Sequence, residues 1–378
     1  MVLMKRVAII SENFDMGGMQ RVAGVIGKSI SNYEDVYYYS MFSKANFYNI
    51  DKNFFVGDVT VTQKIKFLRF WRYRKRIDIM INGQYSVAKY YSKDIQLLID
   101  WVKSKKIDTV ILCGPFLIAM IPYFKEKIDI KIIGWIHNNY DIYLNEYTRP
   151  FNNDYLEGLN RADALVCLTE YDRKKFLKHN ANCKLIYNPV TISNNKVSTL
   201  TEKNISFTGR VDYKHKGIDF LLLIAALLPK DWTITIAGGG EKKQVKKLKA
   251  DINKMHLQNR VIFLGPKGIE DLKKHYLNSS IYLMTSRWEG MPLVLAEAMS
   301  FGLPIIAFSE SGSNEVLKNG DYGILVDNGN INILEKELRR LIKDIELRKE
   351  YQEKSIERVK KFDILKISEK WLKLIDSI

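Results

Sequence analysis

Short apolar runs rich in β-branched residues alternate with amphipathic stretches along almost the whole chain, and this alternation strongly limits the possible folds. The apolar runs span residues 6–11, 36–41, 109–113, 131–137, 164–169 and 184–188, then 205–208, 233–237, 260–264, 281–285, 304–308 and 322–326. Amphipathic stretches such as 216–228, 241–255 and 269–278 lie between them. Strands spaced by helices imply βαβ units and parallel sheets. The near-continuous apolarity of the runs is typical of strands covered on both faces. The sequence therefore predicts an α/β protein.

One polar, weakly patterned segment, residues 188–204, interrupts this rhythm and is typical of a linker. A chain of 378 residues is long enough for two domains. We therefore predict two doubly wound, Rossmann-like domains that face each other across a central cleft, residues 1–190 and 191–360. The last segment, 361–378, is predicted to be a helix that packs back on the first domain.

The net charge of the chain is +16, from 59 Lys and Arg against 43 Asp and Glu, and the excess is spread over both halves. No apolar run approaches the roughly 18 residues that a membrane span needs. The first residues are too short an apolar stretch for a secretory signal. The three cysteines form no CxxC pair, which argues against a disulfide framework and for a reducing cytoplasm.

In the first half, two features sit where a parallel sheet binds its ligands, beyond the carboxyl ends of the strands. Gly17 and Gly18 follow the first apolar run and precede a predicted helix over 22–31, so their backbone can approach an anion. A plain tight turn is the alternative. His137 ends the strand over 131–136, where a purely structural histidine is the alternative. The other four histidines lie in Lys-rich contexts that predict surface positions.

In the second half, basic residues follow the end of a strand. Arg210 comes directly after the run 205–208, and Lys216 lies before Gly217 and a predicted helix. A guanidinium and an ammonium at this edge suit phosphate oxygens. The stretch Gly238-Gly-Gly240 also follows a strand, but it is not the GxGxxG of dinucleotide-binding proteins.

The segment 285–302 carries two carboxylates, Glu289 in a loop and Glu297 within a predicted helix whose first turn includes Pro292. Carboxylates near a helix N-terminus accept hydrogen bonds from sugar hydroxyls, while the helix N–H groups bind a phosphate or another oxygen. A general acid/base pair is the alternative. The chain has no Asp-x-Asp, no HExxH and no paired His/Cys spacing, so no metal site is predicted. Positive charge would then replace Mg²⁺ beside a phosphate leaving group.

Taken together, these motifs resemble those of the retaining glycosyltransferases of family 4, which have the GT-B fold. The most specific element is the E-x7-E motif from Glu289 to Glu297. The Gly-Gly pair, the strand-end histidine, Tyr187–Val190 and the block 207–217 follow in family order, so the resemblance covers nearly the whole chain.

The resemblance implies roles around the donor diphosphate. The backbone at Gly17 and Gly18 would face the donor phosphates and the transferred sugar. His137 would orient that sugar, and Arg210 and Lys216 would hold the diphosphate as it leaves. The family places its lysine five residues after the arginine, whereas Lys216 is six after and Lys214 four after, so both remain candidates.

The resemblance also implies roles toward hydroxyl groups and the base. Glu289 would grip the hydroxyls of the donor sugar, and Glu297 would bind those of the ribose. The loop around Gly265 would meet the nucleobase through its backbone. Backbone groups beside Glu289 would assist it, at Gly290, Met291 and Leu293.

A basic segment of the first half has aromatic residues interleaved and no acid before Asp78. It is predicted to bind an anionic membrane surface, where each nearby cation contributes on the order of 1 kcal/mol. Stacking on nucleic acid and an ordinary helix with buried aromatics are the alternatives. The predicted membrane-binding residues are Lys64, Lys66, Arg69, Trp71, Arg72, Arg74, Lys75 and Arg76.

The sequence thus predicts a cytoplasmic enzyme, peripheral on the inner face of the cell membrane. It would be a retaining glycosyltransferase that moves a hexose or N-acetylhexosamine from a nucleotide sugar, UDP-linked, to a polyprenyl-linked or cell-surface glycan acceptor. It would need no metal or other cofactor and bind no nucleic acid. The alternatives are a catalytically silent, glycosyltransferase-like subunit that binds a partner, and a nucleic-acid-binding protein.

Overall fold

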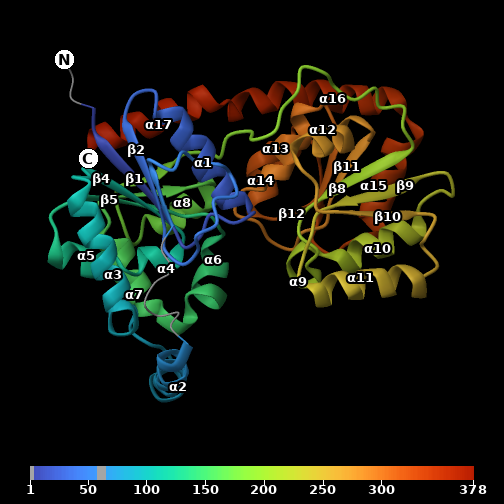
Figure 1. The fold of residues 1–378 in the computed structure, drawn as a ribbon. Coiled ribbons are helices and arrows are strands. Elements are labelled where there is room, and N and C mark those ends of the chain that lie inside the picture. The colour runs from blue at the N-terminus through green and yellow to red at the C-terminus, as the bar shows by residue number, and fades with distance from the viewer. Residues whose placement is uncertain (1–3, 58–64) are drawn as a thin grey trace. The chain divides into compact units, whose positions relative to one another are not determined.

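The computed structural model describes residues 4–57 and 65–378, with the backbone alone for 65–70. The chain forms two compact units, unit 1 with Met1–Asn188 and Ile364–Ile378, and unit 2 with Pro189–Asp363. The divisions thus fall two residues before and three residues after the boundaries predicted at 190 and 360. Each unit is a parallel sheet with helices on both faces (Figure 1).

The sheet of unit 1 has the strand order β3-β2-β1-β4-β5-β6-β7, and its paired strands are parallel. The central strands are buried along their whole length, which explains their unbroken apolar sequence. The strands are β1 (Arg6–Ser11), β2 (Asp35–Ser40), β3 (Phe55–Gly57), β4 (Thr109–Cys113), β5 (Lys131–Trp135), β6 (Ala164–Cys167) and β7 (Cys183–Leu185).

Helices from distant parts of the chain cover this sheet. The helix α1 packs on the C-terminal helix α17, where Ser368 bonds Ser29 at 2.7 Å. The ring of Trp371 in α17 also lies 4.6 Å from that of Trp135 in β5. The main helices of unit 1 are α1 (Gly18–Ile30), α2 (Ile65–Asn82), α3 (Val87–Ser104), α4 (Pro115–Ile118), α5 (Ile121–Lys127), α7 (Asn152–Arg161), α8 (Glu170–Phe176) and α17 (Ile364–Ser377). Short helical turns lie at α6 (Tyr140–Ile142), η2 (Tyr143–Tyr147) and η3 (Arg149–Phe151).

The sheet of unit 2 is also parallel, in the order β10-β9-β8-β11-β12-β13. Its strands are β8 (Asn204–Thr208), β9 (Thr233–Ala237), β10 (Val261–Gly265), β11 (Ile281–Met284), β12 (Ile305–Ser309) and β13 (Ile324–Asp327). Its helices are α9 (Tyr213–Lys216), α10 (Ile218–Leu227), α11 (Lys242–Lys254), α12 (Ile269–Leu277), α13 (Leu293–Ser300), α14 (Ser311–Leu317), α15 (Ile331–Lys343) and α16 (Ile345–Val359), with turns η4 (Lys318–Gly320) and η5 (Lys360–Phe362).

Two local expectations differ from the structure. Pro292 precedes α13 instead of lying within its first turn, because its ψ of 105° is extended. The predicted helix over 216–228 is broken at Gly217, where φ is +61°, so that α9 and α10 are separate. Only glycine adopts that conformation at low cost. The two positions lie next to predicted site residues, Gly217 beside Lys216 and Pro292 beside Leu293, and they set the direction of the backbone at those residues.

Within residues 4–57 and 65–378, no helix combines the length and the apolar character needed to cross a bilayer.

Candidate functional site

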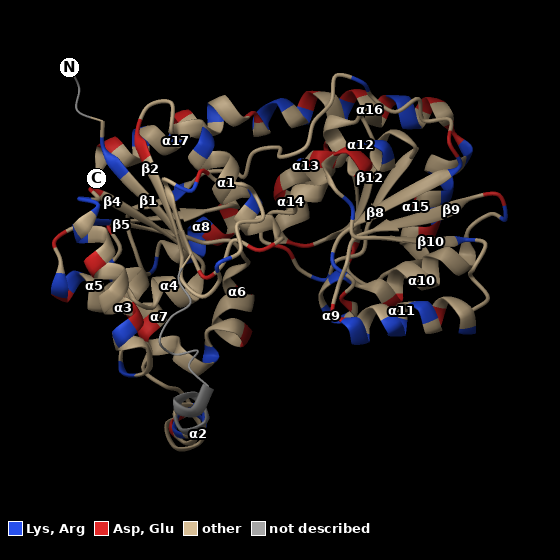
Figure 2. Cartoon of the chain, in the orientation of Figure 1, with Lys and Arg blue, Asp and Glu red and all other residues tan. Residues whose placement is uncertain are grey.

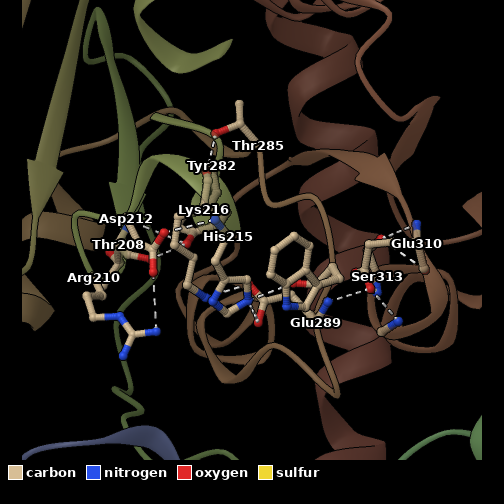
Figure 3. A network of polar contacts seen from close by, with 12 residues as sticks. Thr208, Arg210, Asp212, His215, Lys216, Tyr282, Thr285, Glu289, Glu310 and Ser313 are labelled. Atoms are coloured by element: carbon tan, nitrogen blue, oxygen red, sulfur yellow. Dashed lines mark hydrogen bonds and ion pairs between the residues drawn. The ribbon is translucent and has the colours of Figure 1, made fainter. Parts of the chain in front are cut away.

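The centre of the site in unit 2 is an ion pair between two predicted residues. Nζ of Lys216 lies 2.5 Å from Oε1 of Glu289, and the two side chains are 15% and 10% exposed. Nε2 of His215 lies 3.6 Å from the other carboxylate oxygen of Glu289. Lys216 and His215 come from α9 and the carboxylate from the loop between β11 and α13, at the carboxyl edge of the sheet (Figure 3).

These neighbours fix the charge of the Glu289 carboxyl. Burial pushes the pKa of Glu289 upward, but Lys216 and His215 outweigh burial and hold that pKa well below its ordinary value of 4.5. Glu289 is therefore ionised at neutral pH. It can accept hydrogen bonds from hydroxyl groups, but it has no proton to donate as an acid.

The position of α9 is fixed by bonds to the loop that carries Glu289. The carboxylate of Asp212 caps α9 by accepting from the N–H of His215 at 2.9 Å. The N–H of Arg287 donates to the carbonyl of His215 at 2.8 Å, and its guanidinium donates to the carbonyl of Tyr213 at 2.7 Å. Arg287 also bonds Asp219 of α10 at 2.6 Å, so one side chain ties the two helices to the loop.

Gly217 brings α9 against the end of β11. A Cβ on this residue would lie 2.1 Å from the carbonyl oxygen of Thr285. The hydroxyl of Thr285 donates to the carbonyl of Lys216 at 2.9 Å. The close approach of these two backbones therefore needs glycine, and it sets where the Lys216 side chain begins.

The structure separates the two candidate lysines. Lys216 reaches Glu289, whereas Lys214 is exposed and has its ammonium 5.6 Å from the ring centroid of Trp288. Arg210 has a side chain 60% exposed, with Nη2 3.6 Å from Asp212. Arg210 thus presents its guanidinium to solvent beside the start of α9.

The loops near Arg210 contain glycines that allow close backbone contacts. A Cβ at Gly238, where φ is +148°, would lie 1.9 Å from the carbonyl oxygen of Gly209. The N–H of Gly238 donates to the carbonyl of Gly265 at 2.9 Å, which connects the ends of β9 and β10. Gly265, the predicted contact for the nucleobase, has a φ of +71° and open space where a Cβ would stand.

Glu297 lies in a different environment from Glu289. It is 1% exposed, and its two carboxylate oxygens accept from the hydroxyl of Thr191 at 2.6 Å and from that of Tyr276 at 3.1 Å. A ribose hydroxyl would have to share an oxygen with one of these donors. Gly290 and Met291 are buried in the loop before α13, and Leu293 begins that helix.

Sequence reasoning missed two residues of this site, His215 and Glu310, and it also misplaced His275, which lies in α12. His215 was expected on the surface, but its ring stacks on Trp288 at 5.0 Å and its Nε2 contacts the Trp288 carbonyl at 2.8 Å. His275, also expected on the surface, is 6% exposed. Glu310, which directly follows β12, accepts a hydrogen bond from the N–H of Glu289 at 2.9 Å. The lysine-rich sequence around the two histidines gave no signal that they are buried. Glu310 was missed because glutamate is not a common N-cap residue.

The residues predicted in unit 1 lie near the ends of β1 and β5. His137 follows β5, and its N–H donates to the hydroxyl of Tyr143 at 3.3 Å. Its Nε2 is buried without a hydrogen-bond partner among the described residues, and burial lowers the pKa of His137 to about 3. The imidazole is therefore neutral at physiological pH and offers one unsatisfied ring nitrogen.

The Gly-Gly pair of unit 1 lies at the start of α1. The hydroxyl of Tyr48 accepts from the N–H of Gly17 at 3.0 Å and donates to its carbonyl at 2.7 Å. The φ of Gly17 is −171°, an extended value open to any residue, and Gly18 begins α1. Tyr48 thus already contacts the backbone predicted to face a donor.

The predicted membrane segment divides in two. Trp71 packs edge-on against Tyr90 at 5.5 Å, and Nζ of Lys75 lies 3.0 Å from the hydroxyl of Tyr91 and 3.8 Å from the ring centroid of Tyr85. Burial lowers the pKa of Lys75 to about 8. These two side chains pack α2 on α3. Lys64 lies outside the described residues, as do the side chains of Lys66 and Arg69. Three further predicted residues are exposed, namely Arg72, Arg74 and Arg76.

Across the parts of the chain that the structure describes, no group of three or more His, Cys, Asp and Glu side chains is arranged to hold a metal ion.

Comparison with known proteins places this geometry in a family. The sequence profile of the family Glycosyl transferases group 1 matches residues 191–358, which include the ion pair of Lys216 and Glu289. An uncharacterized glycosyltransferase of Haemophilus influenzae is 31% identical over 313 residues, covering 80% of this chain and 86% of the relative.

Two further proteins are similar along the whole chain. The first is a Campylobacter jejuni GalNAc-α-(1->4)-GalNAc-α-(1->3)-diNAcBac-PP-undecaprenol α-1,4-N-acetyl-D-galactosaminyltransferase, 26% identical over 386 residues and 99% of both chains. The second is HepE of Anabaena, whose crystal structure in complex with UDP and glucose matches with a TM-score of 0.79, 18% identity and full coverage of both chains. The likeness to HepE shows that the fold is GT-B, with two Rossmann-like domains. On its relative in H. influenzae the chain belongs to the glycosyltransferases, and its residues 191–358 form a domain of the family Glycosyl transferases group 1.

Proposed function

We propose that this glycosyltransferase is a retaining enzyme that moves a hexose or N-acetylhexosamine from a UDP-sugar to a lipid-linked or cell-surface glycan acceptor, without a metal ion. The observation that carries the donor part is the grouping of Arg210, Lys216 and Glu289 at one sheet edge of unit 2. The two cations suit phosphate oxygens, and the ionised carboxylate suits sugar hydroxyls.

The charges account for the leaving of the diphosphate. As the bond between the anomeric carbon and the phosphate oxygen breaks, negative charge grows on the β-phosphate. Lys216 and Arg210 stabilise that charge more in the transition state than in the ground state. The ammonium of Lys216 has three donors, so it can contact a phosphate oxygen while keeping Glu289. In this proposal the two cations do the work that a metal ion does in other enzymes.

The same ion pair supports retention of configuration. Glu289 is held by Lys216 at 2.5 Å, and a carboxylate paired in this way is a weak nucleophile. We propose that the acceptor hydroxyl attacks the anomeric carbon from the face that the phosphate leaves. The new bond forms from the acceptor oxygen to that carbon, and the departing phosphate takes the hydroxyl proton.

The choice of donor and acceptor is supported by the similar proteins. HepE was solved with UDP and glucose, which favours a UDP-linked donor. The name of the C. jejuni relative includes an undecaprenol diphosphate acceptor, which favours a lipid-linked glycan. The open backbone position at Gly265 suits a flat base beside the end of β10.

A thermal-shift panel of UDP, GDP, ADP and their sugars tests the donor, because a ligand that binds the folded state raises the melting temperature. We expect a shift with UDP and with one UDP-sugar, unchanged by EDTA. Transfer to a polyprenyl diphosphate glycan, with the anomeric configuration of the product read by NMR, tests the reaction. The absence of any shift across the panel would contradict the proposal, and an inverted product would exclude retention.

The exposed arginines of α2 support a further part of the proposal, that the enzyme works at the inner face of the cell membrane. Arg72, Arg74 and Arg76 are exposed, and near them Tyr73 and Met80 are 64% and 79% exposed. Figure 2 shows that Lys and Arg also gather along α11, where no such apolar residues accompany them. Cations beside exposed apolar side chains suit the interface of an anionic bilayer.

A further inference from the structure

Glu310 joins the loop of Glu289 to the start of α14. One of its carboxylate oxygens, Oε2, accepts from the N–H of Glu289 at 2.9 Å and from that of Gly312 at 2.8 Å. The other, Oε1, accepts from the N–H of Ser313 at 2.5 Å. Three backbone donors from two segments thus converge on one partly buried side chain (Figure 3).

The two segments are also packed closely. A Cβ on Gly312 would lie 2.8 Å from the carbonyl oxygen of Gly290 and 3.0 Å from Cβ of Glu289. The hydroxyl of Ser313 accepts from the N–H of Glu310 at 3.2 Å, which completes a capping box. The first turn of α14 therefore supports the loop that carries the Glu289 carboxylate.

A helix cap alone does not require this arrangement. Ser, Thr, Asp and Asn are the common N-cap residues, and each reaches only the N–H groups of its own helix. The longer side chain of glutamate extends to a third donor outside the helix. A carboxylate has two acceptor oxygens for these donors, whereas the amide of glutamine has one.

We infer that Glu310 is a positioning residue for catalysis, which holds the backbone of Glu289 so that its carboxylate meets Lys216 and the donor sugar. This inference rests on the proposed role of Glu289 in donor binding. Glu310 itself touches neither Lys216 nor, in this proposal, the substrate. Its contribution should therefore affect kcat more than the affinity for UDP, whose diphosphate is assigned to Arg210 and Lys216.

The charges around Glu310 give this role a distinctive dependence on pH. Burial, above all, and the charge of Glu289 raise the pKa of Glu310 to about 7, despite the N–H groups that it accepts. The ionisable groups nearby are Glu289 from the β11–α13 loop and, beyond its carboxylate, Lys216 and His215 of α9. Protonation removes a buried charge, which stabilises the fold as a whole, but it weakens Glu310 as an acceptor for the N–H of Glu289. We therefore expect kcat to fall as the pH drops below about 7. A purely electrostatic role would have the opposite sign, because removing a negative charge would favour the anionic donor.

The test compares the full-length wild type with Glu310→Gln. Asp344→Asn is a matched control, because Asp344 caps α16 by accepting from the N–H of Leu347 at 3.0 Å and lies on another helix. Amide hydrogen exchange is followed in residues 286–292, UDP binding by calorimetry, and kcat and KM with the UDP-sugar from pH 6 to 8. For Glu310→Gln we expect exchange at Glu289 at least tenfold faster, kcat about tenfold lower and flat with pH, and Kd for UDP within twofold of wild type. Asp344→Asn should match the wild type in this segment.

The other possible results either contradict the role of Glu310 or contradict the proposed function. Wild-type exchange and a wild-type pH profile in Glu310→Gln would overturn the inference, as would an equal loss of kcat in Asp344→Asn. If the wild type binds UDP but transfers no sugar, the proposed function fails, while the exchange measurement still tests the hold of Glu310 on Glu289. If Glu310→Gln does not fold, Glu310→Asp retains a carboxylate but draws it back by one methylene. It should then show a smaller change of the same kind, and wild-type values in it would overturn the inference.

Discussion

Lys216 and Glu289, 73 residues apart in the chain, form an ion pair of 2.5 Å in which neither side chain is more than 15% exposed. An ion pair at this depth has a different energetic meaning from one on the surface. Both charges have lost much of their hydration, and each depends on the other for compensation. A mutation of either residue therefore changes stability as well as chemistry.

We predict that Lys216→Ala destabilises unit 2 by about 3 kcal/mol, since removal of one partner leaves a buried charge uncompensated. Adding Glu289→Gln should recover part of that loss, because the amide needs no counter-charge. Urea unfolding of the two single mutants and the double mutant measures the coupling. If the changes in unfolding free energy are additive, the two side chains do not interact directly. The kcat of Lys216→Ala is measured under conditions where the variant is folded, because its stability is lower.

Arg210 offers a cleaner test of the diphosphate role. Its side chain is 60% exposed, and the nearest carboxylate oxygen of Asp212 is 3.6 Å away, so the pair contributes little to stability. Arg210→Ala should leave the free energy of unfolding within about 0.5 kcal/mol of wild type. Loss of a group that stabilises developing charge lowers kcat by about 100-fold. Lys214→Ala is the matched comparison. An equal loss of kcat in that variant would contradict a specific role of Arg210 at the diphosphate.

Much of this architecture could be predicted from the alternation of strands and helices. The run 109–113 coincides with β4, because a strand buried on both faces needs unbroken apolar sequence, and the run 233–237 coincides with the partly buried β9. The short edge strand β3, over Phe55–Gly57, carried no such signal, since its side chains are only partly buried. The sequence placed Lys216 and Glu289 at the ends of two strands of one sheet, but it did not predict that the two side chains form an ion pair.

The other neighbours of Glu289 could not be predicted, because they are set by contacts between distant segments. Glu310 follows β12, the neighbour of β11, and the close packing of Gly312 against Gly290 brings its carboxylate to the β11–α13 loop. In unit 1, Lys75 has the sequence context of a membrane-facing cation. Its ammonium nevertheless lies 3.8 Å from the ring centroid of Tyr85, just before α3, and 5.0 Å from that of Tyr91 on α3, because both rings offer it a cation–π contact.

The two glutamates near α14 should give stability opposite slopes with pH. The pKa of Glu310 is raised from 4.5 to about 7, so its stabilising contribution is present below pH 4.5 and is lost as the pH rises through 7. The pKa of Glu289 is lowered, so its contribution is present above pH 4.5 and is lost on acidification. Unfolding free energies should fall by about 1–3 kcal/mol between pH 5 and 8 in the wild type relative to Glu310→Gln. Parallel curves for the two proteins would show that Glu310 does not titrate in this range.

Gly217 should tolerate no side chain. An alanine there would adopt φ near +61° and place its Cβ 2.1 Å from the carbonyl oxygen of Thr285, so the backbone would have to move. We expect Gly217→Ala to lose about 2 kcal/mol or more of unfolding free energy and to lower kcat through Lys216. Gly268→Ala is the control, because its φ is −73° and nothing lies within 4 Å of an added Cβ. Equal stability of the two variants would contradict the strained turn.

In α2, Arg72 and Arg76 are exposed, whereas Lys75 packs on α3. Arg72→Ser combined with Arg76→Ser removes two exposed charges and should leave the fold intact. Each cation near an anionic bilayer contributes about 1 kcal/mol, so affinity for vesicles rich in anionic lipid should fall by about 30-fold.

The matched control for this double mutant removes the same charge from unit 2. Lys243→Ser with Lys246→Ser takes two exposed lysines from α11, which has no exposed apolar partner for a bilayer in its sequence. Co-sedimentation with anionic and neutral vesicles at two salt concentrations separates specific docking from general attraction. If both double mutants lose the same affinity, the attraction comes from the net charge of +16 and not from α2. If the wild type binds neutral vesicles equally well, the arginines are not what holds it at the surface.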